Sequence, residues 1–207
     1  MGNKHGKKPK EYPDEPVVHE LKEIDLYAVY SYANYLKWEF HERVELIRGK
    51  LFKMAAPGTL HQQISMRLSV KIYNHLDFKC QVFAAPFDVR FYKESRDDAD
   101  IFTVVQPDIC VICNPSKIDS KGCLGAPDIV IEILSPGNNK KELRLKYELY
   151  QEYGVQEYWI INPVKKHIIK YVIQDGIYSA GRFYLEGDIM HSDALPEFNL
   201  NISGLFT

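Results

Sequence analysis

The strongest indication of the fold of this chain is a pair of short apolar runs, Val104–Ile112 and Ile129–Leu134. Runs of this length that are rich in Val and Ile are typical of strands buried in a sheet. Each run contains one acid, Asp108 in the first and Glu132 in the second. Because burial of an unpaired carboxylate is costly, each acid is expected to be paired, protonated or bound to a metal. Either acid alone could be structural, whereas two in neighbouring strands are harder to explain by structure alone.

Strand spacing decides which acids can share one ion. Asp108 and Glu132 can stand side by side, because neighbouring strands lie about 4.8 Å apart. Asp128 shares a face with Glu132 but is four residues earlier, about 13 Å away at about 3.3 Å per residue, which is too far for one small cation to bridge. We therefore expect Asp128 to be a turn or strand-entry residue after Pro127. Carboxylate oxygens and water are the ligands that Mg²⁺ and Mn²⁺ prefer.

The rest of the chain predicts a mixture of helices and strands. Helices are expected at 26–40, at 60–77 and from Asn138 or Asn139 to about Tyr153, with Gly154 after the last turn. Further strands are expected at 44–47, 51–54, 80–85, 87–91, 157–161, 168–173 and 177–185, with turns at Arg48-Gly49-Lys50 and Asp175-Gly176 and loops at 92–103 and 114–127. This order predicts one α/β (α+β) domain over 21–207, with a mixed β-sheet flanked by helices, after a flexible basic tail at 1–20.

Composition excludes several classes of protein. The chain has 207 residues, 45% of them apolar, which does not fit a disordered, collagen-like or disulfide-dense protein. The 26 basic and 28 acidic residues give a net charge of −2, which excludes a protein that coats nucleic acid by bulk charge but allows a local basic patch. No secretory signal and no membrane-spanning run is visible, so we expect a cytoplasmic protein without a membrane partner.

The four cysteines are Cys80, Cys110, Cys113 and Cys123. Without a secretion signal they are expected to be reduced, ordinary buried thiols. Cys110-x-x-Cys113 suggests zinc, but there is no second such pair, and the spacing would point the two side chains to opposite faces of a strand. A structural zinc site is therefore the weaker interpretation.

A lysine lies on the buried stripe of the third helix. Leu143, Tyr150 and Tyr153 define one face of that helix, and Lys146 falls on the same face. Its long stem could cover apolar surface while the ammonium reaches water. Alternatively, the ammonium points at the two carboxylates and at a bound phosphate. The helix pattern alone leaves both interpretations open.

An ordered set of segments contains these residues. The set is VELIRG at 44–49, His61, APFDVR at 85–90, VQPD at 105–108, GAPDIVIEILSP at 125–136, KYELY at 146–150 and GVQEYW at 154–159. With these spacings, the chain resembles the Uma2 ("Uma-two") family of restriction endonucleases, a branch of the PD-(D/E)xK nuclease superfamily. The resemblance covers about residues 27–205.

The resemblance implies a restriction-endonuclease-like core that uses Mg²⁺ or Mn²⁺, and no organic cofactor, to hydrolyse DNA phosphodiester bonds. Asp108 and Glu132 would hold the metal with the main-chain carbonyl of Ile133. The lysine of the (D/E)xK motif is replaced here by Leu134. Lys146 would take its place from the following helix, where it would orient water or stabilise negative charge.

Three further residues are candidates for the same site. Glu45 and Asp88 are candidate catalytic residues, as an additional metal ligand or a water relay, and the alternative is a salt bridge with Arg48 or Arg90 respectively. His61 could contact phosphate, although a histidine that starts a helix is more often structural.

Basic residues cluster on the helix beside the proposed site. Lys140, Lys141, Arg144 and Lys146 could guide phosphate or could form an ordinary solvated face. Because many nucleases cut two strands, a homodimer is expected by analogy.

Three functions are compatible with the sequence. The leading one is a metal-dependent endonuclease acting on DNA. The second is a non-catalytic nuclease-fold DNA-binding or regulatory module that keeps a relic metal site. The third is a carboxylate-based hydrolase of glycosidic bonds, which would need two acids about 5–9.5 Å apart and neither metal nor Lys146.

Overall fold

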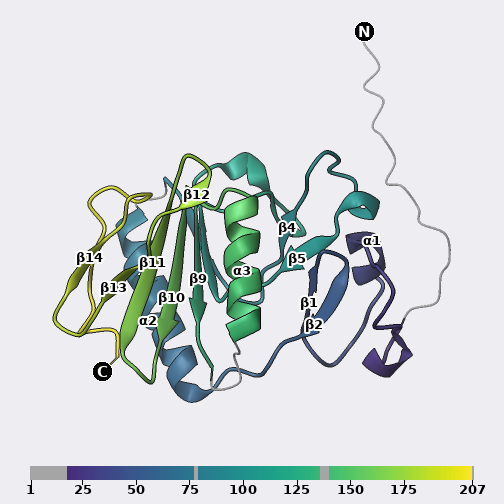
Figure 1. Cartoon of the computed structure of the whole chain (residues 1–207), viewed down its shortest axis with the longest axis horizontal. Helices are drawn as coiled ribbons and strands as arrows, with labels where there is room; N and C mark the ends of the chain where they lie inside the picture. The colour runs from purple at the N-terminus through teal and green to yellow at the C-terminus, as the bar shows by residue number, and fades with distance from the viewer. Residues whose placement is uncertain (1–17, 77–78, 136–139, 207) are drawn as a thin grey trace, which may run out of the picture.

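Two mixed β-sheets and two long helices build the structure, a computed structural model that describes residues 18–76, 79–135 and 140–206 (Figure 1). The six-stranded sheet has the order β2-β1-β5-β4-β8-β7. The seven-stranded sheet has the order β12-β11-β10-β9-β6-β3, with β13 also pairing with β11, while β14 and β15 pair separately. This arrangement confirms the expected α+β fold with mixed sheets.

The elements have the following bounds. The six-stranded sheet contains β1 (Val44–Ile47), β2 (Lys50–Lys53), β4 (Val89–Phe91), β5 (Thr103–Val105), β7 (Ile118–Asp119) and β8 (Gly122–Leu124). The seven-stranded sheet contains β3 (Gln81–Ala84), β6 (Ile109–Ile112), β9 (Ile129–Ile133), β10 (Glu157–Asn162), β11 (His167–Gln174), β12 (Ile177–Tyr178) and β13 (Arg182–Tyr184). The last pair is β14 (Ile189–His191) and β15 (Asn199–Asn201). The helices are α1 (Tyr32–Tyr35), α2 (Thr59–Leu76) and α3 (Lys140–Glu152), with short 3₁₀ turns η1 (Leu21–Glu23), η2 (Asp98–Asp100) and η3 (Pro115–Lys117).

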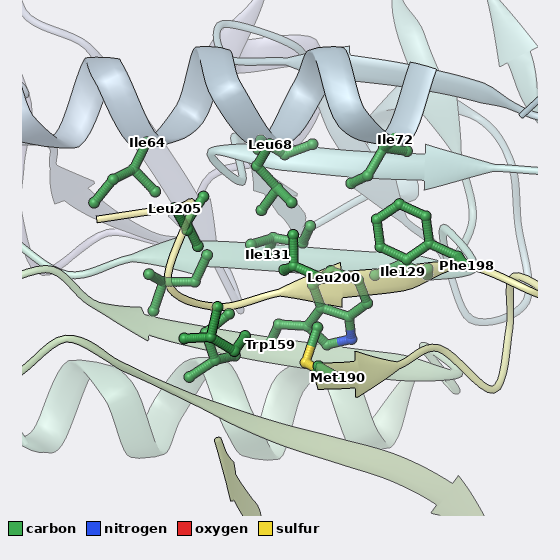
Figure 2. Close-up of a cluster of buried hydrophobic side chains, with 14 of the residues drawn as sticks. Ile64, Leu68, Ile72, Ile129, Ile131, Trp159, Met190, Phe198, Leu200 and Leu205 are labelled. Atoms are coloured by element: carbon green, nitrogen blue, oxygen red, sulfur yellow. The ribbon is translucent and has the colours of Figure 1, made fainter. Parts of the chain in front are cut away.

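The helices α2 and α3 cover opposite faces of the seven-stranded sheet (Figure 1). Successive side chains of a strand point to opposite faces, and β9 shows this clearly. Ile129 and Ile131 pack in one buried cluster with Leu68 of α2, where β14 and β15 also contribute side chains (Figure 2). Val130 lies in the other cluster, with Leu149 of α3. Glu132 has the same parity as Val130, so its side chain belongs to the α3 face.

Several predicted elements are confirmed. The helix predicted at 60–77 is α2, and the predicted hairpin at 44–54 is β1 and β2. In its turn the backbone has positive φ at Arg48 (51°) and at Gly49 (75°). Glycine adopts this conformation without steric cost because it has no Cβ. Gly154 ends α3 with φ 77°, as predicted.

The helix predicted over 26–40 is wrong. Only Tyr32–Tyr35 is helical, beginning after a capping box between Ser31 and Asn34. Aromatic residues are weak helix formers, and here their rings pack together instead. Trp38 lies 5.2 Å from the ring of Tyr30 and 5.8 Å from that of Tyr35, and it bridges to Val18 rather than continuing the helix.

Three predicted segments divide differently from the expectation. The run at 104–112 is not one strand, because β5 and β6 belong to different sheets. Pro107 lies between them and has no N–H for a sheet ladder. The predicted loop at 114–127 contains β7 and β8, and the predicted strand at 177–185 divides into β12 and β13.

The prediction of four reduced, buried thiols is also wrong. Cys80 and Cys113 form a disulfide, and only Cys110 and Cys123 are free and buried. β3 and β6 pair antiparallel with Gln81 opposite Ile112, so the residues just beyond this pair face each other. The separation of 33 residues hides this register in the sequence.

Two predictions lie wholly or partly outside the described residues. The predicted tail at 1–20 is described only from Val18, whose main chain hydrogen-bonds with Lys37 and Glu39. The predicted helix start at Asn138 or Asn139 is not described, and α3 is described from Lys140. None of the helices in the described ranges is long and apolar enough to cross a bilayer.

Candidate active site

Asp108 and Glu132 come together on neighbouring antiparallel strands. β6 and β9 pair with Ile109 opposite Ile131. Asp108 immediately precedes Ile109 and Glu132 immediately follows Ile131, so the two acids lie at the next pair of positions along the ladder. The Asp108 carboxylate accepts a hydrogen bond from the main-chain N–H of Ile133 through Oδ2 at 2.7 Å. This contact fixes Asp108 against the strand that carries Glu132, so the predicted adjacency is confirmed.

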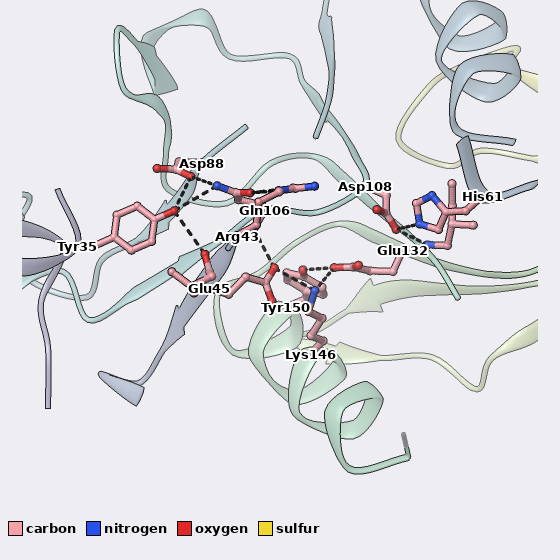
Figure 3. Close-up of polar contacts among 12 residues, drawn as sticks. Tyr35, Arg43, Glu45, His61, Asp88, Gln106, Asp108, Glu132, Lys146 and Tyr150 are labelled. Carbon is pink, nitrogen blue, oxygen red and sulfur yellow. Dashed lines mark hydrogen bonds and ion pairs between the residues drawn. The ribbon is translucent and has the colours of Figure 1, made fainter. Parts of the chain in front are cut away.

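Glu132 is a buried carboxylate with two donors from α3. Lys146 Nζ lies 2.9 Å from Glu132 Oε1, and the Tyr150 hydroxyl donates to the same oxygen at 2.6 Å (Figure 3). Burial raises the pKa of Glu132 to about 7, against the lowering effect of the Lys146 charge. Lys146 and Tyr150 are one turn apart on the same helix face, so α3 supplies both donors.

Lys146 does not extend to solvent, so the snorkelling interpretation is wrong. Lys146 is only 5% exposed. Its ammonium contacts Glu132 and also lies 3.1 Å from Glu45 Oε1. Burial opposes the charged form, but the charges of Glu132 and Glu45 outweigh it and raise the pKa of Lys146. One buried ammonium therefore serves two buried carboxylates.

Glu45 comes to this site from β1 in the other sheet. Besides Lys146, Glu45 Oε1 accepts the main-chain N–H of Gln106 at 2.9 Å. The suggested salt bridge with Arg48 is not formed, because Arg48 contacts Glu152 at 2.8 Å instead. Glu45 therefore joins the two sheets at the point where the chain passes from β5 to β6.

Asp88 is linked to Glu45 through Gln106, which hydrogen-bonds to both carboxylates. Gln106 Nε2 donates to Asp88 Oδ1 at 2.8 Å, and the hydroxyls of Tyr32 and Tyr35 lie 3.4 Å from the same carboxylate. Burial raises the pKa of Asp88. The suggested salt bridge with Arg90 is not formed, because Arg90 contacts Asp119. Asp88 does not line the cavity that Asp108, Glu132 and Lys146 share.

Gln106 is a site residue that the sequence did not reveal. Its Oε1 accepts two hydrogen bonds from Arg43, at 3.0 and 2.7 Å, while its Nε2 donates to Asp88 (Figure 3). The sequence signal that could have identified Gln106 is its position before Pro107-Asp108. Its main-chain N–H lies between two sheets, so it needs an acceptor outside the strand ladders. Tyr150 was also missed, because it counts as an ordinary apolar position of the helix.

His61 contacts the same oxygen of Asp108 that accepts the Ile133 N–H. Its Nε2 lies 3.1 Å from Asp108 Oδ2 at the first turn of α2. Burial opposes the charged imidazolium, but the hydrogen bond and charge of Asp108 raise the pKa of His61 above its ordinary value. The histidine therefore orients Asp108, which gives it a structural role in addition to any contact with phosphate.

These groups lie in one cavity of about 750 Å³. The site acids and Lys146, the end of β2 and the first turns of α3 form its wall. The lining residues include Glu45, Phe52, Lys53, Met54, His61, Asp108, Glu132, Ile133, Lys141, Leu143, Arg144, Leu145 and Lys146. Of the predicted basic cluster, Lys140 does not line the cavity. Asp128 lies outside it, and accepts the main-chain N–H of Cys113 at 2.7 Å as expected of a turn residue.

The donor set fits a hard divalent cation. All hydrogen bonds to Asp108 and Glu132 from the described residues go to Oδ2 and Oε1, leaving Oδ1 and Oε2 without a protein donor. No group of three or more His, Cys, Asp or Glu placed for a metal occurs in the described part of the chain. Two carboxylates and a main-chain carbonyl suit Mg²⁺, which keeps several waters and substrate oxygens in its shell.

Comparison with known proteins places this chain in a family. The family model named Uma2, described as "Putative restriction endonuclease", matches residues 32–203. The chain belongs to the Uma2 family. An uncharacterized protein (slr1290) of Synechocystis sp. strain PCC 6803 is 28% identical over 145 residues, which cover 68% of this chain and 73% of that protein.

A solved structure shares the fold of this Uma2 protein. The crystal structure of a protein from Anabaena variabilis ATCC 29413, described as a "putative nuclease", matches with a TM-score of 0.68. The match covers 86% of this chain and 97% of that one at 22% identity. At this identity the comparison establishes the shared fold and no more.

Proposed function

We propose that this Uma2 protein is a metal-dependent endonuclease that hydrolyses DNA phosphodiester bonds. The observation that carries the proposal is the convergence of Asp108, Glu132 and Lys146 on one cavity. Family membership and the description of the Anabaena relative as a nuclease support the same reaction. A homodimer and a cytoplasmic location remain predictions.

The residues of the site divide the work. Asp108 and Glu132, with the Ile133 carbonyl, would hold Mg²⁺ or Mn²⁺ through the oxygens that lack protein donors. When bound, the metal supplies a water of lowered pKa and neutralises charge on the phosphate. Lys146 orients Glu132 and favours its ionised form against burial, and its buried ammonium lies close to the carboxylates where negative charge would develop. Glu45 fixes that ammonium from the opposite side.

Cleavage of supercoiled plasmid in Mg²⁺, Mn²⁺ or EDTA tests the proposal. We expect nicked and linear products only with a metal, and loss of at least about 100-fold in rate in Asp108→Asn. Asp175→Asn is the matched control, because Asp175 lies in a β-turn with φ 51°, which Asn also adopts. Equal cleavage by Asp108→Asn, or cleavage in EDTA, would remove the proposed site from the reaction.

A second candidate is a non-catalytic DNA-binding or regulatory module of the same fold. It is favoured by one observation, that Lys146 already has two carboxylate partners within the protein. Such a module would bind the metal at Asp108 and Glu132, as measured by calorimetry, and would cleave no substrate. Metal binding without cleavage over varied DNA substrates would decide for this alternative.

A further inference from the structure

Phe52 is placed toward the acids by the pairing of β1 and β2. Phe52 lies directly opposite Glu45 in this antiparallel pair. Directly opposed residues project their side chains from the same face of the ribbon. Glu45 uses this face to reach Lys146, and Ile47, two residues on, packs in the same buried cluster as Tyr150 of α3. The face that carries Phe52 is therefore the face turned to α3 and the site.

The Phe52 side chain is partly exposed at the wall of the cavity. It lines the cavity and is 36% exposed, unlike the buried Ile47 of the same face. The aromatic rings between Tyr30 and Phe40 pack on one another. Phe52, in contrast, makes no ring–ring contact with any aromatic residue of the described ranges. An aromatic ring left open beside a recessed charged site is a surface that a flat, apolar group can cover.

The residues around Phe52 are apolar, and basic residues line the same cavity. Met54, Leu143 and Leu145 line the cavity together with Phe52. Lys141 also lines it and has no carboxylate partner among the residues described. Arg144 is held by Glu148 at 2.7 Å. An aromatic and apolar wall beside a lysine that pairs with none of the described carboxylates matches the stacking surface and phosphate contact of single-strand binding proteins.

The acids are recessed. The side chains of Asp108 and Glu132 are 17% and 11% exposed, so a phosphodiester must enter the cavity to meet them. In a duplex, the faces of the bases are covered by their neighbours, and the phosphates are what the outer surface presents. A paired base therefore has no face to offer Phe52, whereas an unpaired base exposes a flat π-face that stacks on an aromatic side chain.

Resting on the nuclease function proposed above, we propose that the site takes an unpaired DNA nucleotide whose base stacks on Phe52 and whose backbone is contacted by Lys141. The substrate is then a single strand, or a nucleotide in an unpaired stretch of a duplex, in preference to a fully paired duplex. Phe52 acts as a substrate-binding residue, separate from the acids that support hydrolysis.

Binding measured apart from cleavage tests this inference. Labelled oligonucleotides of one sequence, as a single strand, a full duplex and a duplex with a central unpaired bubble, are titrated with the protein in EDTA and in Ca²⁺, with fluorescence anisotropy as the readout. We expect the single strand and the bubble to bind more tightly than the duplex. Phe52→Ala should weaken binding of the single strand by about 5- to 100-fold, and Phe52→Tyr should retain it.

Phe183→Ala is the matched control. Phe183 is another exposed phenylalanine, 58% exposed on β13 and away from the cavity lining, so its loss should leave all affinities unchanged. Equal affinity for single strand and duplex, or no effect of Phe52→Ala, overturns the inference while plasmid cleavage by the wild type still supports the nuclease. Absence of binding to every oligonucleotide overturns the inference, and absence of metal-dependent cleavage of both plasmid and single strand as well overturns both proposals.

Discussion

Lys146 Nζ lies 2.9 Å from Glu132 Oε1 and brings the first turns of α3 onto the end of β9. The same ammonium lies 3.1 Å from Glu45 on β1 of the other sheet. All three residues are buried, with exposed fractions of 3% to 8%. The group therefore contributes to the folding of the domain as well as to the proposed chemistry, and the two contributions have to be measured separately.

The first prediction concerns the stability supplied by this lysine. Lys146→Met keeps the apolar stem but leaves two buried carboxylates without their cation, so we expect the free energy of unfolding to fall by about 3–5 kcal/mol. Urea denaturation at neutral pH measures the change. Lys71→Met, at an exposed position of α2, is the control and should change stability by less than about 0.5 kcal/mol. A loss below about 1 kcal/mol in Lys146→Met would show that the three charges are not a buried unit.

The second prediction concerns the hydroxyl of Tyr150. Its 2.6 Å hydrogen bond to Glu132 is charge-assisted and fully buried. Tyr150→Phe should lower the free energy of unfolding by about 1.5–3 kcal/mol, because a hydrogen bond to a buried charge is lost while the ring packing remains. Tyr73→Phe, at a tyrosine of α2 that is 60% exposed, is the control for loss of a hydroxyl. Equal stability of the two variants would contradict the contact.

Much of the site could be predicted because it depends on periodicities. Strand spacing brought Asp108 to Glu132, and helical periodicity put Lys146 on the buried face of α3. Both rules act over a few residues and are visible in one sequence. The contact of Glu45 with Lys146 joins residues far apart in the chain, and no local pattern encodes it.

The parts that were missed depend on packing and on register between distant segments. Gln106 is important because its main-chain N–H lies where β5 leaves one sheet and β6 begins in another, and this break is marked only by Pro107. The failed helix at 26–40 had the right periodicity, but contacts between aromatic rings gave a different packing. The disulfide of Cys80 and Cys113 follows from a strand pairing that the sequence did not specify.

The third prediction separates Asp88 from the metal site. Asp88 accepts hydrogen bonds from Gln106, Tyr32 and Tyr35 and does not line the cavity. Asp88→Asn replaces one acceptor oxygen by a donor, so we expect a loss of about 1–3 kcal/mol in the free energy of unfolding. Mg²⁺ affinity, measured by calorimetry on the folded variant, should be unchanged, whereas Asp108→Asn should abolish it. Loss of Mg²⁺ binding in Asp88→Asn would make Asp88 a ligand or relay after all.

The last prediction concerns the pH dependence of metal binding. Burial raises the pKa of Glu132 to about 7, so a large fraction of this acid carries a proton at pH 6 and little of it does at pH 8. A metal binds the ionised carboxylate and must displace that proton, so its apparent affinity should rise with pH, by about tenfold between pH 6 and 8. Calorimetry at pH 6 in buffers of different ionisation enthalpy should show release of close to one proton per metal bound. Tyr150→Phe removes a donor that favours the ionised form, so its rise in affinity should extend to higher pH. An affinity that is flat from pH 6 to 8, with no proton released, would show that Glu132 is already ionised and that Lys146 dominates over burial.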